Sequence, residues 1–164
     1  MNIETIPVLI DQFRETFEGE VTPGMCWITD GTPESAIFGM IGALTPEQAL
    51  AAPAPGARPI AGHIAHLHFA LALTARRLRG ENPPADWATS FELADATPAG
   101  WEILNTHLRR SYDQVLTTLQ EMRGKQVHEV PAINLVGLAA TIAHNAYHLG
   151  AIRQIAQVVR AQHA

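Results

Sequence analysis

The sequence has few cysteines, no long apolar run and few basic residues, and so lacks the features typical of secreted, membrane and nucleic-acid-binding proteins respectively. Its 164 residues include one cysteine, Cys26, so no internal disulfide can form. Only 16% of the residues are charged, and the net charge of −5 leaves no basic stripe for a nucleic acid. No apolar run approaches the ~20 residues that span a bilayer, and Asp11, Arg14 and Glu15 interrupt any apolar leader. We therefore expect a cytoplasmic protein that binds neither nucleic acid nor membrane.

The composition that remains is that of a folded domain. Apolar residues make up 47% of the chain, which excludes a disordered protein. A chain of 164 residues can bury a real core, and we expect residues 1–164 to form one domain. Eight histidines are many for this length, and they direct attention to a metal site.

Helical periodicity dominates the sequence, and no period-two pattern predicts a strand. Apolar residues recur at helical spacing in four long segments, which predicts an all-α fold of the bundle type. The four segments cover residues 5–18, residues 59–79, the stretch from Thr97 to the residue before Gly124, and residues 133–160.

The connections carry their own signals. Thr32-Pro33 reads as an N-cap followed by proline and predicts a short helix through Ile41, and Thr45 to Gln48 forms a capping box before another short turn. The first connection should therefore contain short extra helices. A loop through Trp87 and Phe91 follows the second long helix and is long enough to cover a site.

His144 and His148 lie four residues apart on the last predicted helix, which places them ~40° apart on one face. Ile152, Ile155 and Val159 project to the same side, so both imidazoles point into the bundle. Two imidazoles one turn apart can bind the same ion. The alternative is a pair of hydrogen-bonded histidines on a packed face.

A second histidine cluster lies on another predicted helix. His66 and His68 project ~160° apart and cannot serve one site, which leaves His68 as a structural or surface residue. His63 and His66 project only ~60° apart. Helical geometry therefore leaves both His63 and His66 as candidates for a third ligand.

At these residues the chain resembles the DinB/YfiT-like superfamily of metalloenzymes. The resemblance rests on the segments 59–67 (PIAGHIAHL) and 144–152 (HNAYHLGAI), and on the opening of the third long helix at 97–101 (TPAGW). The chain departs from the usual pattern in two ways. The chain has Leu149 and Ala151 around Gly150, and Ala70 where many members carry a carboxylate.

The resemblance implies a four-helix bundle of up-down-down-up topology, frequent homodimers, and a divalent metal ion, zinc or nickel, on three histidines. In the register of the signature, the ligands are His66, His144 and His148. His63 then lies one turn from a ligand and is the candidate catalytic residue, as acceptor of a released proton. Asn145 and Tyr147 are candidates for orienting the ligands by hydrogen bonds.

Three imidazoles leave coordination positions open, which is typical of a catalytic metal site. The understood members of the superfamily imply activation of a low-molecular-weight thiol for S-transfer to an electrophilic small-molecule substrate. Two alternatives remain: a hydrolase that uses a metal-activated water, and a non-catalytic, stress-associated binding protein that the metal stabilises.

Overall fold

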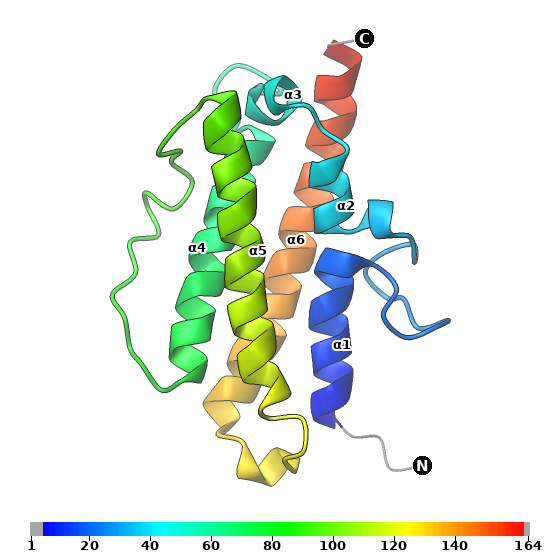
Figure 1. Ribbon diagram of the computed structural model, residues 1–164, viewed down its shortest axis with the longest axis vertical. Coiled ribbons are helices and arrows are strands. Elements are labelled where there is room, and N and C mark those ends of the chain that lie inside the picture. Colours follow the sequence, from blue (N-terminus) through cyan, green and yellow to red (C-terminus); the bar gives the residue numbers. More distant parts are fainter. Residues whose placement is uncertain (1–4, 163–164) are drawn as a thin grey trace.

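The computed structural model describes residues 5–162, and every regular element in that range is a helix. Four long helices lie side by side (Figure 1). They are α1 (Thr5–Glu18), α4 (Ile60–Leu78), α5 (Pro98–Gln120) and α6 (Ala132–Gln162). The short elements are η1 (Pro33–Ser35), α2 (Ile37–Gly42), α3 (Pro46–Leu50) and η2 (Val127–Glu129). The predicted all-α class is confirmed, and no described helix is long and apolar enough to cross a membrane.

Local signals set the helix ends close to their predicted positions. The Thr97 hydroxyl accepts a hydrogen bond from the Gly100 N–H at 3.1 Å and caps α5. Thr45 and Gln48 form the predicted capping box before α3. Gly80 follows α4 with φ +84°, a left-handed conformation that glycine adopts without strain.

One contiguous apolar core joins the long helices. Each contributes side chains at helical spacing that are fully buried, because these stripes face the other helices rather than solvent. The large members of this core include Phe13, Phe17, Ile64, Leu71, Leu108, Leu119, Leu149 and Ile152. The core fixes α4 against α6, and these two helices carry the histidines discussed below.

The prediction of one short helix from Pro33 to Ile41 was wrong. Ala36 is extended (φ −98°, ψ 167°) and separates η1 from α2. In a continuous helix the Ser35 carbonyl would accept from the Gly39 N–H, but here it accepts from the Arg153 guanidinium of α6. A tertiary contact therefore overrides the local helix signal.

Candidate metal centre

His66 of α4 meets His144 and His148 of α6 in a cluster that we call the three-histidine cluster. The His144 Nε2 atom lies 2.9 Å from His66 Nε2 and 3.1 Å from His148 Nε2. One ring nitrogen of each residue lies within 4.8 Å of the other two. The structure thus brings together the three histidines that the resemblance names.

The two Nε2–Nε2 separations from His144 fit a shared ion. An ion that holds imidazole nitrogens at ~2.0–2.1 Å separates neighbouring donors by roughly 2.9 Å at right angles and roughly 3.3 Å at the tetrahedral angle. The two observed separations, 2.9 and 3.1 Å, lie in that interval. Three neutral imidazoles also suit zinc and nickel as ligands.

Burial keeps the three imidazoles neutral. His66 and His148 are 6% and 3% exposed, and His144 is half-buried. Burial, with the nearby His144 charge, lowers the pKa of His66 to about 4, and the same causes lower the pKa of His148 to about 3. Burial also lowers the pKa of His144. Their lone pairs are therefore available at neutral pH without the loss of a proton.

Ser90 fixes which nitrogen of His66 faces the cluster. The Ser90 hydroxyl donates to the Trp87 carbonyl at 2.7 Å, so its oxygen is free to accept from His66 Nδ1–H, also at 2.7 Å. The proton of His66 then resides on Nδ1, and Nε2 presents a lone pair to His144 and His148. An outer hydrogen bond of this kind is typical of histidines that bind metals.

The loop between α4 and α5 (residues 79–97) covers the cluster with aromatic side chains. The Phe91 ring stacks on the His66 imidazole with centroids 4.0 Å apart, and the Arg58 guanidinium lies 4.3 Å from the Phe91 centroid on its ring face. The Trp87 ring lies 5.7 Å from His66. This loop was predicted to be long enough to cover a site, and it does so.

We expect Ser90→Ala to weaken metal binding about 10- to 100-fold, the usual cost of removing an outer hydrogen-bond partner. The variant leaves the His66 Nδ1–H without its acceptor and frees the ring to turn. Competition with a chromophoric chelator measures the affinity. Ser111→Ala is the matched control, because Ser111 makes the same hydrogen bond, 2.8 Å long, to the Nδ1 atom of His68. Equal affinities for the two variants would contradict the role of Ser90.

His63 lies beside the cluster rather than in it. Its Nδ1 atom is 3.0 Å from His148 Nδ1, so one of the two rings donates to the other. The His63 ring also lies edge-on to Phe91, with centroids 5.8 Å apart. Burial and then the Arg58 charge lower its pKa. Helical position alone left His63 and His66 as alternatives for the third residue. In the structure, His66 is the one that meets His144 and His148.

The other residues that the sequence singled out make fewer contacts with the three-histidine cluster. His68 contacts the exposed His107 ring on α5 and lies apart from the three-histidine cluster, as expected of a structural residue. Asn145 is fully buried, and within residues 5–162 its amide has no hydrogen-bond partner, so it does not orient the ligands as predicted. Tyr147 is 71% exposed and packs edge-on against His148 at 5.1 Å.

Comparison with known families agrees with this geometry. A family model described as the DinB superfamily matches residues 34–156, a range that spans α2 to most of α6 and includes all three histidines. The chain belongs to the DinB superfamily. No curated protein and no solved structure matches it. Membership in the DinB superfamily and the three-histidine cluster together indicate a metal-binding protein.

Proposed function

We propose that this DinB-superfamily chain is a metal-dependent enzyme that transfers a low-molecular-weight thiol to an electrophilic small molecule. The observation that carries the proposal is the convergence of three neutral imidazoles from α4 and α6 beneath an aromatic loop. His66, His144 and His148 would hold zinc or nickel. The ion supplies Lewis acidity, which brings the pKa of a coordinated thiol or water toward neutrality.

The surroundings of the cluster favour thiol transfer over hydrolysis. The cavity that reaches His144 has a volume of about 1130 Å³, beyond the ~300–1,000 Å³ typical of a site for one ligand. It therefore has room for a thiol and its acceptor together.

In the proposed reaction, the thiol sulfur forms a bond to the electrophilic carbon, and the leaving group departs with its electron pair. The thiol proton must reach a base, and His63 is the candidate that we propose. With His148 Nε2 turned to the cluster, its Nδ1–H donates to His63 Nδ1, so His63 would take up the thiol proton on Nδ1 only after this hydrogen bond opens. His63 thereby also holds the His148 ring in place, a positioning role.

Figure 1 also supports the bundle topology that we propose. Following the colours along the chain, α1 and α6 run upward, while α4 and α5 run downward. This order is the up-down-down-up topology that the family resemblance implies. A homodimer remains a prediction.

The test is an assay of the metal-loaded protein with chlorodinitrobenzene and, in turn, bacillithiol, mycothiol and glutathione. We expect absorbance of the thioether product with at least one thiol, and its loss after chelation. His63→Phe, assayed with metal in excess because His148 loses an outer hydrogen-bond partner, should lower kcat and alter the pH profile. Hydrolysis of ester substrates without any thiol would identify a hydrolase instead. A chelation-sensitive melting temperature with no turnover at all would indicate a non-catalytic metal protein.

A further inference from the structure

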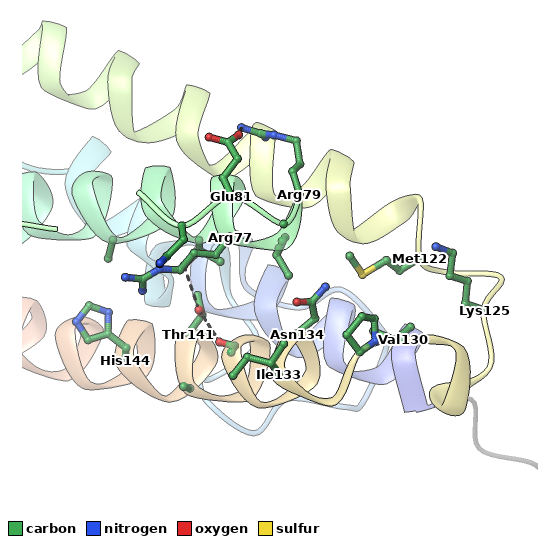
Figure 2. A pocket seen from close by; sticks show the side chains of 18 of the residues that line it. Arg77, Arg79, Glu81, Met122, Lys125, Val130, Ile133, Asn134, Thr141 and His144 are labelled. Carbon is green, nitrogen blue, oxygen red and sulfur yellow. Dashed lines mark hydrogen bonds and ion pairs between the residues drawn. The ribbon is translucent and has the colours of Figure 1, made fainter. Parts of the chain in front are cut away.

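A cavity opens beside the three-histidine cluster, between the C-terminal half of α4 and the N-terminal half of α6. We call it the α4–α6 cavity, and its volume is about 1130 Å³. His144 lies at one end, and Lys125 with Val130 lies at the other (Figure 2). A molecule in this cavity would therefore reach from the cluster to the connection between α5 and α6.

The cavity is cationic although the chain carries a net charge of −5. Three cationic side chains line it (Arg77, Arg79 and Lys125), against one carboxylate, Glu81. Arg79 is paired with Glu81 at 3.4 Å. Neither Arg77 nor Lys125 forms an ion pair with any carboxylate of residues 5–162. Arg77 and Lys125 are exposed side chains at the cavity wall, and two positive charges without an ionic partner there favour an anionic ligand.

The remaining wall is mainly apolar. Leu78 of α4, Met122 after α5 and Ile133 of α6 all face the cavity. Ile133 is 74% exposed, an unusual state for a large apolar side chain that lines a concave site. Covering this wall with the apolar body of a ligand would be favourable. The thiols named above are polar molecules, so this wall suits the acceptor better than the thiol.

Figure 2 places Arg77 between His144 and Lys125 on the α4 side of the cavity. The two free cations thus lie at different points along the cavity rather than in one cluster. A phosphate dianion is usually held by several donors at one point, whereas one guanidinium matches one carboxylate through two parallel hydrogen bonds. The arrangement therefore favours a singly charged group at Arg77.

We propose that the α4–α6 cavity binds an amphipathic carboxylate, with the carboxylate on the Arg77 guanidinium and the apolar body against Leu78, Met122 and Ile133. This inference names the class of electrophilic substrate, and it rests on the proposed function only for the reaction that follows binding. Arg77 then determines specificity for anionic substrates.

The test compares decanoate with decanamide, which has the same chain and no charge, by isothermal titration calorimetry. We expect the metal-loaded protein to bind decanoate about tenfold or more tightly than decanamide, as a charge-assisted hydrogen bond provides. Arg77→Met should remove this preference and leave decanamide binding unchanged. Arg110→Met is the matched control, because Arg110 is exposed on α5 and does not line the cavity.

Repeating the titrations after chelation separates this inference from the proposed function. A preference for decanoate that persists without metal and depends on Arg77 supports the inference, even if the purified protein proves to contain no metal. If chelation removes the preference for decanoate but Arg77→Met does not, the carboxylate binds the ion. That result overturns the inference and leaves the metal centre supported. Equal binding of the two probes, or binding of neither, also overturns it.

Discussion

Replacing His148 with alanine should reduce the metal content of the purified protein from about one equivalent to below roughly a tenth of one. Loss of even an outer hydrogen-bond partner costs ~10–100-fold in metal affinity, and loss of a ligand costs more. His148 supplies the Nε2 atom that lies 3.1 Å from His144 Nε2, and only two imidazoles of the cluster would remain. Elemental analysis after dialysis at micromolar protein measures the effect.

His68→Ala is the matched control for this experiment. His68 is a half-buried histidine of α4, but its ring binds Ser111 and lies apart from the cluster. The control should therefore keep its full metal content. If His148→Ala and His68→Ala retain equal amounts of metal, the proposed ligand set is wrong.

Acid should destabilise the metal-free protein steeply below pH 6.5. His66 and His148 have pKa values near 4 and 3 in the folded chain, against 6.5 for an ordinary histidine. Between these values the unfolded chain binds protons that the folded chain does not, so the free energy of unfolding falls as the pH falls. Each histidine that stays neutral contributes a slope of roughly 1.4 kcal/mol per pH unit. Above pH 6.5 their contribution is constant.

Urea unfolding of the chelated protein between pH 7.5 and pH 5 measures this slope. A double variant with His66→Gln and His148→Gln lacks both groups and should lose stability much less over the same range. If the free energy of unfolding of the unaltered chain is the same at pH 7.5 and pH 5, the fold does not keep these imidazoles neutral.

Most of the fold follows from local patterns in the sequence. Apolar spacing and caps, such as Thr97 before α5 and Gly80 after α4, locate the long helices within a few residues. Where a long-range contact competes with a local signal, prediction fails. The Arg153 guanidinium that binds the Ser35 carbonyl lies more than one hundred residues away in the sequence. No pattern near Ser35 predicts this contact.

The candidate site was predictable only where local spacing determines it. The i, i+4 spacing identifies His144 and His148 because a single helix fixes it. Helical projection alone left the choice between His63 and His66 open; the family resemblance pointed to His66, and the packing of α4 on α6 brings this residue to His144 and His148. Ser90 was missed because it acts from a loop, through side-chain hydrogen bonds that leave no periodic trace. A lone serine between Trp87 and Phe91 in a long loop was the one available hint.

The α4–α6 cavity illustrates a further limit of prediction from the sequence. Arg77 belongs to a run of arginines at the end of α4, which the sequence presents as an ordinary solvated helix end. The structure divides this run by contact, because Arg76 and Arg79 bind Glu81 while Arg77 lines the cavity without an ionic partner among the described residues. Charge alone does not reveal such a division, since it depends on where a single carboxylate lies.

X-ray absorption spectroscopy of the zinc- or nickel-loaded protein tests the central claim most directly. Coordination by the three-histidine cluster predicts nitrogen scattering at ~2.0–2.1 Å with the multiple-scattering signature of about three imidazoles. Sulfur scattering at ~2.3 Å, which would place Cys26 on the ion, or a shell of oxygen alone would contradict it.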